Sequence, residues 1–430
     1  MPALMADVAR LAVYLDVSQS VTNFGRHGGE SPYTDFLGWL IGLGSEFAEA
    51  ATYGFADRIA EIDEDAVVGA ARGVAGPCSA CGFQESRLDD VLARIAADEA
   101  PGSLNVVVTD LWLENSDLIG SGRATLQRSV RGILTAGTAI ALIGVAAPYA
   151  GPVYDVPGPG GPATIPAERV SERPLFILVA GPPRQVAELL ERVDGEVFSG
   201  LGDDQLHYSL FSPALAIDGP VEHRLAARDR AVRPAILVHV DGTNVPSFTI
   251  DRQASITRGL PDADSESQGP PPPALAAPVP VDPGPGLTPG GYSLDAEAWT
   301  LGVAGSAGAC EQGAWIPVEV RQALELGGDP GASEVLLDVS HPTLLAVRRG
   351  EVVFVRYSVS VGSVNSDGPS TAWLSDWSFD VAGGGALRAD PPPFFPTLNL
   401  DRFGETLTSA VGALVAGETV ARGSVFLSVE

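Results

Sequence analysis

Lysine is absent from this chain of 430 residues, and all 26 of its basic residues are arginine. This absence excludes mechanisms that need a lysine amine, such as Schiff-base catalysis and the phosphate-binding lysines of P-loop proteins and kinases. The basic residues are outnumbered by 54 acidic ones, which gives a net charge of -28. Because such a chain repels nucleic-acid phosphates and anionic membrane surfaces, we expect neither as a partner.

Cysteine is also scarce, with Cys78, Cys81 and Cys310 as its three residues. A small, odd number excludes a disulfide framework. The spacing of Cys78 and Cys81 supplies half of a zinc site, but no second pair of cysteines or nearby pair of histidines completes it. The pattern leaves three interpretations open: a structural role, a local disulfide or redox pair, and a metal ligand.

Long apolar runs are rare. The N-terminus lacks a basic region before its first apolar run, which Asp16 interrupts, so we expect no signal peptide. The most apolar stretch, residues 133–151, contains two threonines and three glycines and divides better into a helix end and a buried strand. We therefore expect a cytoplasmic protein without a membrane span.

The chain contains 45% hydrophobic residues, which is enough for substantial cores. Residues 11–15 and 105–110 are short apolar runs typical of buried strands, and residues 87–100 have their apolar side chains along one helical stripe. This alternation of strands and helices predicts an α/β domain over residues 1–200, built on a doubly wound, mostly parallel sheet.

A different pattern follows over residues 201–430, where strand-like runs dominate and helical spacing is scarce. We expect this half to form a β-sandwich-like domain. Ten prolines lie between residues 261 and 290. They predict a long exposed loop within the β-rich half.

Polar side chains follow two of the predicted strands. Asp16 ends the first strand and is followed by Ser18 and Ser20, and Asp110 ends a later strand. Because ligands of a doubly wound sheet bind at the carboxyl ends of its strands, the two carboxylates can converge there. Carboxylate and hydroxyl oxygens suit Mg²⁺, and the lack of nitrogen and thiolate ligands argues against zinc. The same residues could instead cap a helix at a strand-to-helix turn.

Residues 16–20, with the sequence DVSQS, resemble the DxSxS motif of the metal-ion-dependent adhesion site in von Willebrand factor A domains. Thr109 and Asp110 resemble the TD pair on the fourth strand of that family, and the resemblance covers about residues 8–195. It implies that a partner's acidic group completes the coordination of Mg²⁺, or of Mn²⁺ or Ca²⁺ in its place. The metal shell implied by the resemblance consists of Asp16, Ser18, Ser20 and Asp110.

Two positions depart from the pattern of the family. The loop that carries a threonine ligand in the family has the sequence GFQESRLDDVL here. Ser86 is the only hydroxyl in register, so we take it as the substitute for that threonine. Leu111 replaces the glycine that usually follows the TD pair.

These features predict a bacterial-type intracellular adaptor rather than an enzyme. Its metal site would bind a protein partner, and its β-rich half would provide a second contact surface. The alternative is a metal-independent scaffold with a degenerate A-type domain, for which Trp373 and Trp377 are candidate contact residues in the β-rich half. A hydrolase is disfavoured because the chain has no G-x-S-x-G nucleophile elbow. A dehalogenase-type enzyme would need an acid where Ser18 stands, and a lysine. The partner and the oligomeric state are not specified by the sequence.

Overall fold

The computed structural model forms two compact units. The first comprises the described residues from Met1 to Ala214 and from Asn365 to Leu414. The second comprises the described residues between these stretches together with Val415–Glu430. The structure describes residues 10–26, 29–74, 78–98, 102–114, 121–213, 221–228, 232–235, 238–240, 243–251, 274–279, 289–302, 314–319, 323–327, 334–339, 341–349, 351–364 and 371–430.

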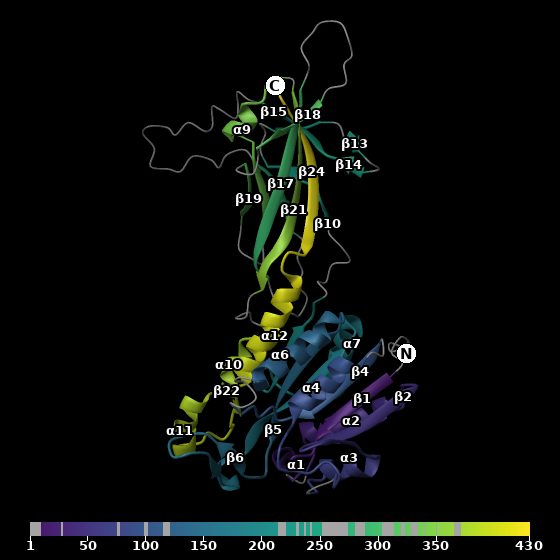
Figure 1. Cartoon of the computed structure of the whole chain (residues 1–430), viewed down its shortest axis with the longest axis vertical. Helices are drawn as coiled ribbons and strands as arrows, with labels where there is room; N and C mark the ends of the chain where they lie inside the picture. Colours follow the sequence, from purple (N-terminus) through teal and green to yellow (C-terminus); the bar gives the residue numbers. More distant parts are fainter. Residues whose placement is uncertain are drawn as a thin grey trace. The chain divides into compact units, whose positions relative to one another are not determined.

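A mixed seven-stranded sheet forms the centre of the first unit as described, and its strand order is β3-β2-β1-β4-β8-β5-β9 (Figure 1). The predicted strands at residues 11–15 and 105–110 are confirmed as β1 and β4, and the α/β class of this unit is confirmed with them. The strands are β1 (Arg10–Asp16), β2 (Glu49–Phe55), β3 (Ile59–Glu61), β4 (Ser103–Thr109), β5 (Ala139–Pro148), β8 (Glu172–Gly181) and β9 (Leu206–Phe211).

The prediction of a mostly parallel sheet is wrong. Strand β1 is parallel to β2 and to β4, but the other four neighbouring pairs are antiparallel. The reason lies between β5 and β8, where the chain forms no crossover helix. It forms instead a small hairpin of β6 (Val153–Val156) and β7 (Ala163–Ile165) and the short 3-10 helix η1 (Ala167–Arg169). Without a crossover helix, β8 returns antiparallel beside β5 and also runs against β4.

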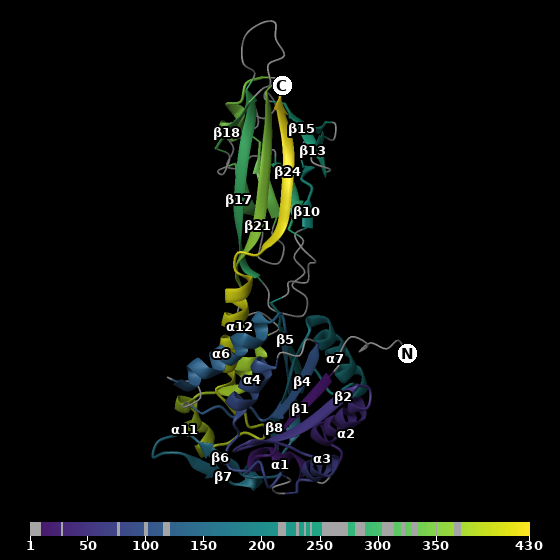
Figure 2. The same cartoon turned by 45° about the vertical axis from the view of Figure 1, so that its right-hand side comes forward.

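Helices cover both faces of this sheet (Figure 2). Alternate side chains of β1, such as Leu11 and Leu15, belong to one core cluster with side chains of α1, α2 and α7. The buried residues of α4 and α6 lie outside that cluster, and these two helices contact each other on the other face of the sheet. The helices are α1 (Gln19–Gly25), α2 (Pro32–Gly44), α3 (Glu64–Ala71), α4 (Leu88–Ala97), α6 (Ser121–Thr135) and α7 (Pro183–Glu196).

The first unit also includes a late part of the chain, so the units do not follow the expected division at residue 200. Trp373 and Trp377 are buried in this unit, and Trp373 donates its indole N–H to the Ser209 hydroxyl at 2.9 Å. They are therefore not surface contact residues of a β-rich half. Sequence periodicity identifies the type of an element but not the sheet on which a late segment packs. The late elements are α10 (Trp373–Asp376), β22 (Ser378–Phe379), α11 (Val381–Ala389), β23 (Thr397–Leu398) and α12 (Leu400–Val415).

The second unit contains mainly strands in its described residues. Along β21, every second side chain from Val353 to Val361 is buried, which is the period of a strand with one covered face. One sheet has the order β12-β15-β24-β21-β17-β18, with β10 also on β24, and another has the order β11-β16-β20-β19. The long strands are β17 (Pro289–Gly302), β21 (Val352–Val364) and β24 (Thr419–Val429) (Figure 1). The short elements are β10 (Val221–His223), β11 (Ala226–Ala227), β12 (Val232–Pro234), β13 (Val238–Val240), β14 (Thr243–Val245), β15 (Ser247–Ile250), β16 (Ala274–Pro278), β18 (Ala314–Val318), β19 (Leu324–Gly327), β20 (Glu334–Asp338) and α9 (Pro342–Leu345).

The expectation of one long exposed loop over residues 261–290 is wrong in part. Strand β16 lies inside this range, pairs with β20, and buries Leu275, Ala276 and Ala277. These apolar residues lie between prolines, and the strand contains proline only at its last residue, where a missing N–H is tolerated. Residues 261–273 and 280–288 lie outside the described residues.

None of the helices in the described part of the chain is long and apolar enough to cross a bilayer. The apolar residues 133–151 divide, as expected, into the end of α6 and strand β5.

Candidate functional site

Asp16 and Asp110 lie at the same edge of the sheet in the first unit. Asp16 is the last residue of β1, and Asp110 directly follows the last residue of β4. These strands are parallel neighbours, so their carboxyl ends meet. Both side chains are fully buried, at 0% exposure. The predicted convergence of the two carboxylates is therefore present in the fold.

The Asp16 carboxylate is surrounded by hydrogen-bond donors. Its Oδ1 accepts from the backbone N–H of Ser18 at 2.9 Å, and its Oδ2 accepts from Ser86 Oγ at 2.6 Å and Thr109 Oγ1 at 2.8 Å. Burial and the nearby Asp110 nevertheless raise the pKa of Asp16 to about 6. The site thus holds a carboxylate whose charge is not fully compensated.

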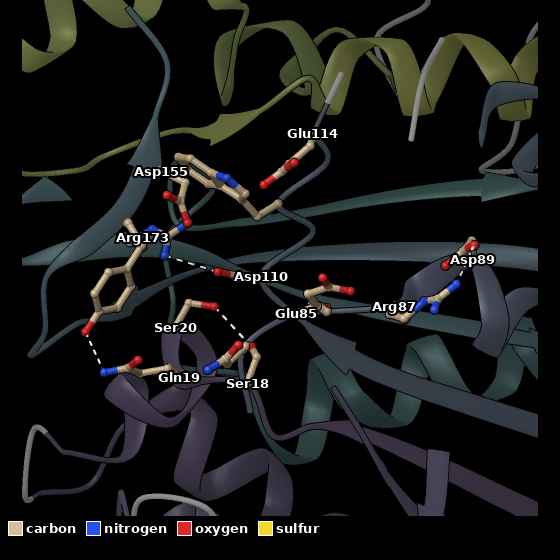
Figure 3. A pocket seen from close by; sticks show the side chains of 14 residues that line it. Ser18, Gln19, Ser20, Glu85, Arg87, Asp89, Asp110, Glu114, Asp155 and Arg173 are labelled. Atoms are coloured by element: carbon tan, nitrogen blue, oxygen red, sulfur yellow. Dashed lines mark hydrogen bonds and ion pairs between the residues drawn. The ribbon is translucent and has the colours of Figure 1, made fainter. Parts of the chain in front are cut away.

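Ser18 and Ser20 stand beside this carboxylate at the start of α1. Ser18 has the N-cap position of the helix, but its side chain makes no capping hydrogen bond. Its hydroxyl instead lies 3.1 Å from the hydroxyl of Ser20 (Figure 3). The helix-cap interpretation therefore accounts for the position of Ser18 but not for the direction of its hydroxyl.

A short loop fixes Ser86 next to Asp16. A disulfide links Cys78 and Cys81, just before this loop in the sequence. It agrees with the local-disulfide interpretation of the cysteine pair. The Asp57 carboxylate then accepts the backbone N–H of Glu85 at 2.8 Å. These contacts hold the loop that places the Ser86 hydroxyl against the Asp16 carboxylate.

Arg173 is the residue of this site that sequence reasoning missed. Its Nη1 lies 3.1 Å from Oδ2 of Asp110, and the arginine is only 1% exposed. The guanidinium carbon lies 5.1 Å from the ring centre of Trp112 and 5.0 Å from that of Tyr149. The sequence did carry one signal for its position: the connection between the strands at residues 139–148 and 172–181 shows no helical pattern. Strands joined without a crossover helix are antiparallel, so the first residues of β8 lie at the sheet edge that carries Asp16 and Asp110.

The chain after Asp110 has an unusual backbone. Leu111 has a φ of 47°, in the left-handed region that favours glycine. The late segment of the unit supports this turn from the other side. Thr397 Oγ1 donates to the carbonyl of Asp110 at 2.9 Å, and Asn399 Nδ2 donates to the carbonyl of Leu113 at 2.8 Å.

A pocket of about 570 Å³ opens over these residues (Figure 3). Ser18, Ser20, Ser86 and Asp110 line it, together with Arg173. Five of its lining residues are acidic and two are arginines, so the lining favours cations over free anions. The acidic ones are Glu85, Asp89, Asp110, Glu114 and Asp155.

The residues present fit a hard divalent cation. A hydroxyl that donates its proton to Asp16, as Ser86 does, keeps its oxygen lone pairs for a metal. Oδ1 of Asp110 is buried and has no hydrogen-bond partner among the described residues. The described side chains contain no cluster of three or more His, Cys, Asp or Glu suited to a metal. The candidate set is instead two carboxylates with three hydroxyls, the oxygen ligands that Mg²⁺ prefers.

The structure brings all five residues expected from the sequence to this site: Asp16, Ser18, Ser20, Ser86 and Asp110. Thr109, which the sequence offers only as part of the TD pair, is in addition a hydrogen-bond donor to Asp16. Comparison with family models, with curated proteins and with solved structures finds no match.

Proposed function

We propose that this chain binds a protein partner through a Mg²⁺ held by Asp16, Ser18, Ser20, Ser86 and Asp110. One observation carries the proposal: two fully buried carboxylates and three hydroxyls gather beside one acidic pocket. When bound, the metal would supply a Lewis-acid centre that a carboxylate of the partner can bind. We propose no enzymatic activity.

The protein groups of the site have separate roles in this proposal. Hydrogen bonds from Ser18 N–H, Ser86 and Thr109 orient the Asp16 carboxylate. Such outer contacts fix the geometry of ligands around a metal. The surrounding acids attract a cation and disfavour a bare anionic ligand, so a partner carboxylate would need the metal charge to bind.

A fold relationship to von Willebrand factor A domains is part of the proposal. Three features support it: the alternating serines that follow Asp16, the parallel placement of β1 and β4, and the left-handed backbone of Leu111 where the family has glycine. For the second unit we propose a β-sandwich, supported by two sheets with alternating buried residues. The cytoplasm remains the proposed compartment.

A metal-independent scaffold is the second candidate. It is favoured by a specific observation, because the Arg173 guanidinium already supplies a positive charge to Asp110. In that case the partner would bind equally well in chelator.

The test of the proposed function is calorimetric titration of the chelator-stripped protein with Mg²⁺ and Mn²⁺. Ser20→Ala should weaken metal binding about tenfold or more, while the exposed Ser375→Ala on α10 should leave it unchanged. Partners captured on the wild type with Mg²⁺ should be lost in chelator and on Ser20→Ala. Partners retained under all three conditions would support the scaffold instead.

A further inference from the structure

The antiparallel direction of β8 brings Arg173 to the candidate site. Thr109 of β4 pairs with Phe176 of β8, so the residues preceding Phe176 lie alongside the chain that follows Thr109. Arg173 is the second residue of β8 and reaches Asp110 for this reason. A parallel strand in the same place would present its last residues at this edge instead.

Arg173 is also held in place. Its backbone neighbours Ser171 and Glu172 both donate their N–H groups to the Pro393 carbonyl at 3.0 Å, and Phe395 donates to the Glu172 carbonyl at 2.9 Å. The guanidinium lies against the rings of Trp112 and Tyr149. A cation in contact with aromatic rings is stabilised by their negative faces. The arginine is therefore a fixed part of the site rather than a surface side chain that can turn to solvent.

The two carboxylate oxygens of Asp110 have different surroundings. Oδ2 accepts from Arg173 (Figure 3). Oδ1 has no hydrogen-bond partner in the described part of the chain. A carboxylate buried at 0% exposure needs a positive charge close by. Arg173 supplies this positive charge without a metal. A metal ion bound to Oδ1 would be repelled by the positive guanidinium on Oδ2 of the same carboxylate.

We propose that Arg173 is a resident counter-ion that stabilises Asp110 in the metal-free protein and lowers the affinity of the site for a divalent cation. The inference rests on the proposed function, since it concerns the same site. The inference gives Arg173 the role of setting the metal affinity of the site. Arg173 belongs neither to the DxSxS motif nor to the proposed set of metal ligands. Removing the positive charge should make the site depend on a metal for its stability.

The test compares wild type with Arg173→Gln, which keeps a polar amide on a shorter side chain but removes the charge. Mn²⁺ is titrated by calorimetry, and melting temperature is measured in chelator and in Mn²⁺. We expect Arg173→Gln to melt lower than wild type in chelator, to recover in Mn²⁺, and to bind Mn²⁺ about tenfold or more tightly than wild type. Arg192→Gln is the matched control, because Arg192 also pairs with an acid and lies over a tryptophan ring, but on α7.

Each outcome bears on the proposal. Equal Mn²⁺ affinity in wild type and Arg173→Gln would overturn the inference and leave the proposed function intact. Binding to Arg173→Gln alone would support the inference and favour a metal-independent role for wild type. No binding to either would overturn both. If Arg173→Gln folds neither in chelator nor in Mn²⁺, the double variant Arg173→Met with Asp110→Asn serves as the second measurement. If that double variant folds without metal, the loss of Arg173 leaves Asp110 with a charge that Mn²⁺ does not compensate, and the inference fails.

Discussion

The hydroxyl of Thr397 donates a hydrogen bond to the backbone carbonyl of Asp110, 2.9 Å away, and joins two residues separated by 287 positions in the chain. The same hydroxyl lies 3.3 Å from the carbonyl of Leu111. A segment after the β-rich stretch therefore holds the turn that carries one of the two candidate metal-binding carboxylates.

Thr397→Val should destabilise the first unit. The substitution keeps the shape of the side chain but leaves buried carbonyl groups without their donor, which costs about 1–3 kcal/mol of unfolding free energy. Chemical denaturation followed by tryptophan fluorescence measures this change. Thr406→Val is the control and should matter little, because among the described residues the Thr406 hydroxyl bonds only within its own helix, to the Arg402 carbonyl. An unchanged unfolding free energy for Thr397→Val would show that the turn does not depend on this contact.

Asp16 should make stability fall as the pH rises. Its pKa is about 6 in the folded protein, against an ordinary value of 3.8, so the folded state binds more protons than the unfolded state between these values. In chelator, the unfolding free energy of wild type relative to Asp16→Asn should therefore decrease by about 2 kcal/mol from pH 4 to pH 7. Denaturant titrations at several pH values measure this difference. Parallel pH profiles for the two proteins would contradict the prediction.

Local patterns in the sequence were sufficient for much of the candidate site. The apolar run at residues 11–15 predicted β1, and the acid and hydroxyls after it predicted a cation site, because these features lie within one short segment. The direction of β8 was not predictable in this way. A strand with nine consecutive buried residues looks the same in either direction, so nothing in its own sequence placed Arg173 beside Asp110. The support from Thr397 was missed for a similar reason, since hydrogen bonds between distant segments leave no periodic signal.

Gly144→Ala tests the packing of the late segment on β5. A Cβ at residue 144 would lie 2.5 Å from a ring atom of Trp373 and 3.0 Å from one of Trp377. Because both rings are buried, the substitution should cost about 1–3 kcal/mol of unfolding free energy. Gly38→Ala on α2 is the matched control. It meets nothing within 4 Å and should stabilise the protein by about 0.5–1 kcal/mol. A neutral Gly144→Ala would indicate that the tryptophans do not pack against this strand.

The disulfide between Cys78 and Cys81 should contribute modestly to stability and measurably to metal binding. It closes a very short loop, so chain entropy gives it about 2 kcal/mol at most. The segment that follows the disulfide contacts the candidate site. The carbonyl of Phe83 accepts the N–H of Gln19 at 3.1 Å, and Ser86 follows Phe83 in the same loop.

A reductant should therefore weaken Mn²⁺ binding in the wild type. It should have no further effect on the Cys78→Ser, Cys81→Ser double variant, in which the disulfide is already absent. Calorimetric titrations with and without reductant make the comparison, with thiol counting by mass spectrometry to verify the redox state. If reduction leaves the Mn²⁺ affinity of wild type unchanged, Ser86 is positioned by the hydrogen bonds of its loop alone, and the disulfide serves stability only.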